Sequence, residues 1–267
     1  MSAQPDGSIH AGPVLVECAG AIATLTLNRP AQYNALSGEV LGALQSALDS
    51  IAADAAVRVV IIAAGGKAFC AGHDLKEMRA SEERSFHQDL FQQCGRMMLT
   101  IHNLPQPVIA QVDGIATAAG CQLVGACDLA VAAADARFAV SGINVGLFCS
   151  TPAVPLSRNM HTKQAMHMLL TGDFIDAETA CRFGLVNAVV ASDRLAAATR
   201  ELAQKVADKS PLSIRLGKKM FYQQLAMDLP AAYAFAAERM ACNMDSEDAR
   251  EGIDAFIQKR KPVWRGR

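Results

Sequence analysis

Two segments of the chain place small residues where a strand-like run ends and a helix-like run begins. They read GGKAFCAGHDLKEM (65–78) and VDGIATAAGCQLVGACD (112–128). The first backbone N–H groups of a helix have no acceptor within that helix. Two such groups aimed at one point form an oxyanion hole, which stabilises a thioester enolate or a tetrahedral oxyanion. Tight packing of a strand against a helix also requires glycine, and for one such turn taken alone this is the commoner explanation.

The elements that must hold these two turns alternate between strand and helix. Strand-like runs occur at 14–28 (a hairpin around Gly20), 57–64, 107–114 and 128–140, and the run 117–127 reads as a short helix. Ser37 is a suitable N-cap for a helix with leucines on one face, and a second helix has an apolar stripe over residues 90–101. Strands separated by helices predict βαβ crossovers and a parallel sheet.

Beyond residue 160 the pattern is almost entirely helical, with one short strand predicted at 185–190. The last helix is predicted to begin after Ser246 and to carry the basic run Lys259–Lys261 in its final turn, because cations stabilise a helix C-terminus. Pro262 then stops it.

The composition excludes several classes of function. The chain has 267 residues, of which 51% are hydrophobic, and a formal net charge of −1, which gives no electrostatic reason to expect nucleic acid or a membrane as partner. Eight cysteines without CxxC or zinc-ligand spacing, and a start without signal-peptide features, predict reduced thiols in a cytoplasmic protein. No HExxH, GxGxxG or GxSxG motif occurs, so metal, nicotinamide and serine-nucleophile chemistry are not expected.

Five stretches together resemble the enoyl-CoA hydratase/isomerase (crotonase) superfamily. They are LNRPAQYNALS (27–37), AFCAGHDLKEM (68–78), DGIATAAGCQLVGACDLAVAA (113–133), GDFIDAETACRFGLVNAVV (172–190) and EGIDAFIQKRKPVW (251–264). The resemblance covers the chain from about residue 13. It implies an α/β fold, a crotonase-type spiral of ββα units followed by a helical trimerisation region. The expected divisions are a flexible N-terminus (1–12), the spiral core (13–200) and a helical oligomerisation region (201–267), assembled as a homotrimer or a dimer of trimers.

The resemblance also implies where an acyl-CoA ligand binds. The backbone N–H groups of His73 and Ala119 are the expected oxyanion donors, although most family members have glycine at the second position. The expected substrate-binding residues are Tyr33, Asn34, Ala35, Ala71, His73, Asp74, Leu75, Lys76 and Ala119. CoA is part of the substrate, and no permanently bound cofactor or metal is expected. The basic run Lys259–Lys261 either reaches the CoA phosphates or is a solvated helix end.

The two glutamates of the family's hydratases are missing from the positions at which the resemblance places them. The first falls on Gln122 and the second on Gly142. An amide does not transfer protons usefully and glycine has no side chain. General acid–base groups contribute ~10²–10⁴-fold each, so we expect very weak hydration of enoyl thioesters.

Other residues could replace the glutamates. Cys149 and Ser150 lie just beyond the second position, and a nucleophilic Cys149 needs a base and a lowered pKa. The His73 side chain could act as a base, whereas helix capping is the preferred interpretation of Asp74. Three functions therefore stay open: an acyl-CoA decarboxylase or isomerase that needs only enolate stabilisation, a non-catalytic CoA-thioester-binding regulator, and RNA binding. RNA binding is disfavoured because the net charge is close to zero and the lysines are scattered along the chain. The densest helical pair is Lys218-Lys219.

Overall fold

The structure is a computed structural model in which residues 12–267 are described. The predicted flexible N-terminus (1–12) lies outside the described residues except for its last position. No helix among residues 12–267 is long and apolar enough to cross a membrane.

The larger sheet has six strands in the order β1-β2-β3-β5-β7-β10. β1 pairs with β2 in antiparallel register, and the other neighbours are parallel. The strands are β1 (Val14–Ala19), β2 (Ile22–Leu27), β3 (Val59–Ala64), β5 (Val108–Val112), β7 (Leu129–Ala133) and β10 (Ala188–Val190). The predicted hairpin and the predicted parallel crossovers are thus confirmed.

A smaller sheet runs beside the first in the order β4-β6-β8-β9. Its strands are β4 (Ala68–Cys70), β6 (Ile115–Thr117), β8 (Arg137–Ala139) and β9 (Ile175–Asp176). β3, β5 and β7 of the larger sheet are each followed directly by β4, β6 and β8 of the smaller one. This repeated step between two sheets produces a spiral, and it brings the ends of β4 and β6 side by side.

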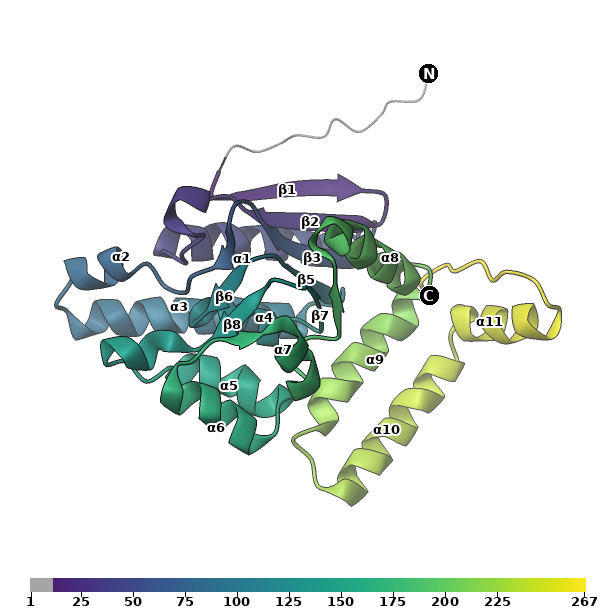
Figure 1. The fold of residues 1–267 in the computed structure, drawn as a ribbon. Helices are drawn as coiled ribbons and strands as arrows, with labels where there is room; N and C mark the ends of the chain where they lie inside the picture. Colours follow the sequence, from purple (N-terminus) through teal and green to yellow (C-terminus); the bar gives the residue numbers. More distant parts are fainter. Residues whose placement is uncertain (1–11) are drawn as a thin grey trace.

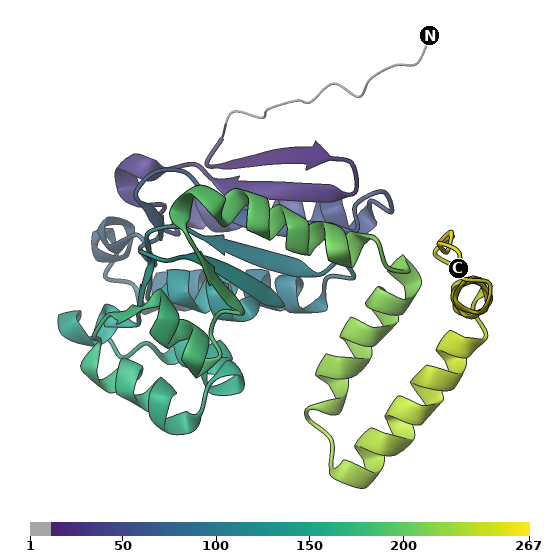
Figure 2. The same cartoon turned by 45° about the vertical axis from the view of Figure 1, so that its right-hand side comes forward.

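Helices cover both faces of the larger sheet, as its largely buried parallel strands require. Figure 1 and Figure 2 show α8 in front of this sheet and α1 behind it. The helices are α1 (Gly38–Ala53), α2 (Leu75–Ala80), α3 (Arg84–Asn103), α4 (Ala119–Ala126), α5 (Ser150–Asn159), α6 (Thr162–Thr171), α7 (Ala177–Phe183), α8 (Leu195–Ala207), α9 (Pro211–Gln224), α10 (Leu229–Met244) and α11 (Glu247–Ile257). Short 3₁₀ turns are η1 (Pro30–Gln32), η2 (Ser141–Val145) and η3 (Ser192–Arg194).

The last three helices leave the sheet. Figure 1 shows α9 and α10 as a pair that points away from the body, with α11 beyond them. The division predicted at residue 200 falls inside α8, which packs against β3, β5 and β7.

The predicted end of the last helix is wrong. α11 ends at Ile257, before the basic run that was expected to form its final turn. Lys259 has a φ of 54°, and the chain then folds back so that Glu251 accepts hydrogen bonds from the Arg260 guanidinium and from Val263 N. Arg260 therefore pairs with the Glu251 carboxylate, nine residues earlier, and does not interact with the dipole at the end of α11.

Candidate active site

The two turns singled out in the sequence are in contact. A Cβ built on Gly72 would lie 2.8 Å from Ala118 Cβ and 3.3 Å from Ala119 N. A Cβ built on Gly120 would lie 2.1 Å from Cys70 O. The glycines therefore serve close packing of strand against helix, and this same packing brings the backbone of residues 73 and 119 together.

Two backbone N–H groups at this contact have no acceptor in the part of the protein that the structure describes. Leu36 bridges to the first turn, donating its N–H to Gly72 O at 2.8 Å and accepting from Asp74 N at 3.3 Å. The N–H of His73, which lies between these two residues, takes part in neither hydrogen bond. Ala119 is the first residue of α4, where no helical acceptor exists. Within residues 12–267, neither of these N–H groups donates a hydrogen bond to the protein.

The turn before α4 is strained at Ala118 rather than at the donor residue. Ala118 has a φ of 50° and a ψ of −120°, whereas the φ of Ala119 is not positive. Positive φ is unfavourable for residues with a Cβ. Alanine at position 119 therefore retains an N–H on a helix terminus without a backbone penalty, and position 118 carries the strain.

The loop before α1 lies beside the first turn. Asn34 is buried, and its Nδ2 donates to Gly65 O and to Ala68 O at 2.8 Å each. Its Oδ1 accepts from Arg29 N, which uses the whole amide within the protein. Tyr33 O accepts from Ala71 N at 3.0 Å, while the Tyr33 ring is exposed. The structure thus brings Tyr33–Ala35 beside Ala71, and the Asn34 side chain ties this loop to Gly65 and Ala68.

Asp74 caps α2, as the sequence predicted. Its Oδ1 accepts from Lys76 N at 3.0 Å and from Glu77 N at 3.3 Å. Leu75 and Lys76 are exposed on the outer surface of this short helix. The Asp74 carboxylate is occupied by the helix end, which argues against a proton-transfer role.

The His73 ring packs into the protein. Its Nδ1 lies 3.3 Å from Leu36 O, and because a carbonyl only accepts, this nitrogen carries the proton. Its ring meets Phe91 edge-on with centroids 5.4 Å apart, and its Nε2 is buried without a partner among the described residues. Burial lowers the pKa of His73 more than the Leu36 carbonyl raises it. The imidazole is therefore neutral near pH 7, and water does not reach its free nitrogen.

Gln122 lies on α4 one turn after Ala118, whose carbonyl accepts its N–H at 3.0 Å. The residue is only 3% exposed, and its Oε1 has no hydrogen-bond partner within residues 12–267. An unpaired buried polar atom is unfavourable by about 1–3 kcal/mol, so this amide is a group that a ligand or water can satisfy.

Gly142 lies in η2 and has no room for a side chain. A Cβ there would lie 2.6 Å from Leu147 O and 2.7 Å from Cys149 Sγ. Burial raises the pKa of the Cys149 thiol, although a hydrogen bond from the Gly142 backbone opposes this. Cys149 is therefore a neutral thiol next to position 142, and the activated thiolate that a nucleophile requires is absent.

Sequence reasoning missed the partners that fix these groups. Phe91 and Leu36 hold the His73 ring, and no local pattern identifies residues so far apart in the chain. Lys218, half of the lysine pair considered for RNA, is buried and pairs with Asp128 at 2.6 Å. In the part of the chain that the structure describes, no cluster of three or more His, Cys, Asp or Glu residues could hold a metal ion.

Comparison with known proteins agrees with the resemblance seen in the sequence. Residues 17–267 match the family described as Enoyl-CoA hydratase/isomerase. The mitochondrial enoyl-CoA hydratase domain-containing protein 3 of Mus musculus is 46% identical over 243 residues, which cover 91% of this chain and 81% of that protein.

Solved structures confirm the α/β fold of the crotonase type. An enoyl-CoA hydratase from Mycobacterium smegmatis superposes with a TM-score of 0.93 at 53% identity, covering 94% of this chain and 98% of that one. Human enoyl-CoA hydratase domain-containing protein 3 superposes with a TM-score of 0.92 at 45% identity, covering 94% of this chain and 100% of that one. The chain therefore belongs to the enoyl-CoA hydratase/isomerase family.

Proposed function

We propose that the protein binds acyl-CoA thioesters and holds the thioester oxygen between the backbone N–H groups of His73 and Ala119. One observation carries the proposal: two N–H groups that have no acceptor among residues 12–267 come from two turns that touch each other. Such preorganised donors stabilise an enolate because they need no reorganisation as charge develops. The loop Tyr33–Ala35 and the segment Ala71–Lys76, which lie together, form the surface for the CoA part.

We further propose that hydration of enoyl thioesters is very weak. The side chain at position 122 is an amide, and position 142 has no space for any side chain. Cys149 and His73 are both neutral, and the free His73 nitrogen is inaccessible to water. Chemistry that needs only enolate stabilisation, such as decarboxylation or isomerisation of an acyl-CoA, is compatible with this set of groups. So is binding without turnover.

The test is hydration of crotonyl-CoA by the purified protein, followed by loss of the conjugated-thioester absorbance, with crotonyl-CoA affinity measured beside it. Gln122→Glu is the informative variant because it keeps the shape of the side chain and adds a carboxylate. Gln92→Glu, on the exposed side of α3, is the matched control. We expect tight binding, negligible hydration by wild type and the control, and a measurable gain in Gln122→Glu.

Each result separates the possible functions. Turnover by wild type at rates ordinary for enzymes contradicts the carboxylate argument. Binding without turnover on crotonyl-, malonyl- and enoyl-isomer thioesters selects the regulator. Lack of CoA-thioester binding contradicts the proposal as a whole.

We propose that α9–α11 join copies of the chain into a homotrimer or a dimer of trimers. α10 is a 16-residue helix with no buried residue, whereas most of the stability of helices in proteins comes from packing of an apolar face. Large apolar side chains on these helices and at the C-terminal end of α9 are exposed: Phe221, Leu225, Leu229, Tyr233, Met240, Phe256 and Ile257. Light scattering should give three or six times the chain mass of 28.3 kDa. A monomer at micromolar concentration contradicts this.

For the compartment we propose the cytoplasm, on the sequence argument alone. The name of the mouse relative places that protein in mitochondria. Fractionation of cells that produce the protein from its own full-length gene distinguishes the two.

A further inference from the structure

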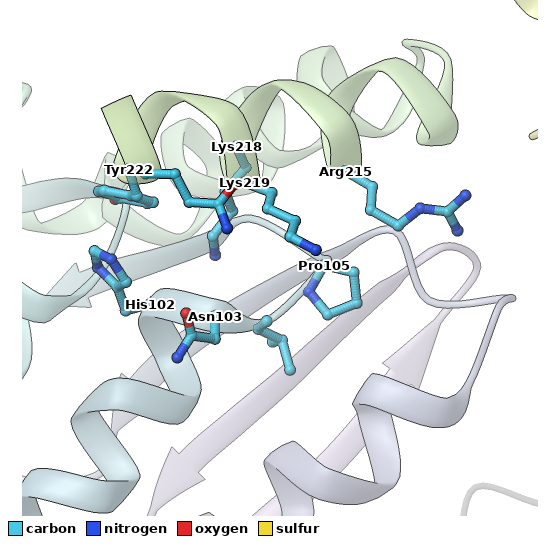
Figure 3. Close-up of a pocket in the computed structure, with 9 residues that line it drawn as sticks. His102, Asn103, Pro105, Arg215, Lys218, Lys219 and Tyr222 are labelled. Atoms are coloured by element: carbon cyan, nitrogen blue, oxygen red, sulfur yellow. The ribbon is translucent and has the colours of Figure 1, made fainter. Parts of the chain in front are cut away.

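We propose that the pocket between the end of α3 and α9 binds a small phosphorylated molecule, at a site separate from the acyl-CoA site. The pocket has a volume of about 460 Å³. This is within the range of small-ligand sites, about 300–1,000 Å³. Figure 3 shows His102 and Tyr222 at one end of it, with Arg215 and Lys219 extending from α9 on the side of Pro105.

The pocket and the candidate active site lie at opposite ends of strand β5 in the larger sheet. Pro105 leads into β5, whereas the second turn of the active site follows the other end of that strand at Val112. The five residues of β5 rise about 16 Å in total. A ligand in this pocket is therefore not in contact with the turns that carry His73 and Ala119.

The buried lysine beside the pocket is already neutralised. Lys218 Nζ donates to Asp128 Oδ2 at 2.6 Å, to Ile101 O at 3.0 Å and to Gln106 O at 3.1 Å. Tyr222 donates its hydroxyl to the other oxygen of Asp128 at 2.8 Å. These contacts use the Asp128 charge and satisfy the carbonyls at the end of α3.

The two remaining cations have no counter-charge among residues 12–267. Arg215 and Lys219 line the pocket one helical turn apart, and within residues 12–267 neither forms an ion pair. No acidic residue is among those that line the pocket. Like charges four residues apart destabilise a helix, and an anion between them relieves this repulsion. The planar fork of arginine and the point charge of lysine both suit a phosphate group.

The rest of the wall is mixed, with the amides of Asn103 and Gln223 beside an apolar part that suits a small organic group attached to the phosphate. The rings of His102 and Tyr222 pack with centroids 3.9 Å apart at 39°, and Leu104 and Pro105 complete this side. Burial, followed by the charge of Lys218, lowers the pKa of His102. The imidazole is thus a neutral, largely flat surface and not a third cation.

Calorimetric titration of the full-length protein with phenyl phosphate, at constant ionic strength, tests the site. Inorganic phosphate is the comparison for the organic group. We expect saturable binding of phenyl phosphate by wild type, weaker binding of inorganic phosphate, and a loss of about tenfold or more for Arg215→Gln and for Lys219→Gln, because each removes a charge-assisted contact.

The matched control is Arg200→Gln with Lys205→Gln, which removes an arginine and a lysine from the exposed side of α8. It should bind phenyl phosphate like wild type, and unfolding curves should show all variants folded. No saturable binding by wild type, or an equal loss in the control and the pocket variants, overturns the proposal. Because the variants lie far from residues 73 and 119, failure here leaves the acyl-CoA proposal standing.

Discussion

The thiol of Cys149 lies too close to residue 142 for that residue to have a Cβ atom. A Cβ built on Gly142 would lie 2.7 Å from Cys149 Sγ and 2.6 Å from the Leu147 carbonyl oxygen. Carbon contacts are favourable at about 3.5–4.0 Å, so neither neighbour leaves room. The loop that follows β8 is therefore built around the absence of a side chain at position 142, and placing a glutamate there requires a different loop path.

Gly142→Ala should lower the free energy of unfolding by about 1–3 kcal/mol, the usual effect of forcing an extra carbon into a packed site. Removing the sulfur in Gly142→Ala/Cys149→Ala should recover only part of the loss, because the Leu147 oxygen belongs to the backbone. Chemical denaturation measures both. Gly95→Ala is the control: nothing lies within 4 Å of its added Cβ. Its helical position should gain about 0.5–1 kcal/mol. An unaffected Gly142→Ala contradicts the crowding.

Ala118→Gly should keep or raise the stability of the fold. Ala118 has a φ of 50°, and positive φ for a residue with a Cβ costs about 1–2 kcal/mol. Glycine removes this strain but adds about 0.4–1 kcal/mol of unfolded-state entropy, so the expected net gain lies between about 0 and about 1.6 kcal/mol. Ala118→Val should be clearly destabilised. Equilibrium unfolding checks the order; a Gly variant less stable than alanine contradicts strain at this residue.

The His73 ring should make stability depend on pH in mildly acidic solution. Burial lowers its pKa from the ordinary 6.5 in the folded protein, so folding disfavours protonation. The stability that the neutral ring contributes is complete above pH 6.5 and falls as the pH decreases from 6.5 to the lower folded pKa. His73→Asn keeps the backbone N–H and removes this titration. Unfolding free energies at about pH 7.5 and about pH 5.5 should therefore differ more in wild type than in the variant. Equal differences contradict the assignment.

Local signals in the sequence predicted the elements that depend on neighbours along the chain. Ser37 caps α1 by accepting from Val40 N, and Asp74 caps α2, because capping needs only the next three residues. The apolar stripe of α3 is confirmed by its buried face. By contrast, β4, β6 and β9 have three residues or fewer, too short for a two-residue period to be recognised.

The parts of the site that depend on distant partners were not predictable. The small residues predicted that the two turns meet, but not that Ala118 has a positive φ, because alanine rarely adopts this conformation. Lys218 and Asp128 are 90 residues apart and pair only because α9 returns to the start of β5. Likewise Cys149 lies against Gly142 because the chain curves back after η2. No pattern of residues in the sequence indicates this curve.

The C-terminal tail should be held by one buried carboxylate, Asp248, which is only 1% exposed. It accepts from Ser210 Oγ at 2.6 Å and, from the returning tail, from Arg265 N at 2.7 Å and Gly266 N at 3.1 Å. Hydrogen bonds to charged groups contribute about 1.5–3 kcal/mol each, and their loss exposes the tail while leaving the core intact. Asp248→Ala should therefore speed tryptic cleavage at Arg265 many-fold.

Asp254→Ala, on the exposed side of the same helix, is the matched control and should be cut at the wild-type rate. Mass spectrometry of timed digests identifies the site and its rate, and urea denaturation separates tail release from global unfolding. Release of the tail alone leaves the main unfolding midpoint close to that of wild type, because α11 stands away from the sheet. If Asp248→Ala and Asp254→Ala are cleaved equally fast, the Asp248 hydrogen bonds do not hold the tail. Other contacts then hold it, among them Trp264 Nε1 donating to Asp208 O at 2.7 Å and Val263 N donating to Glu251.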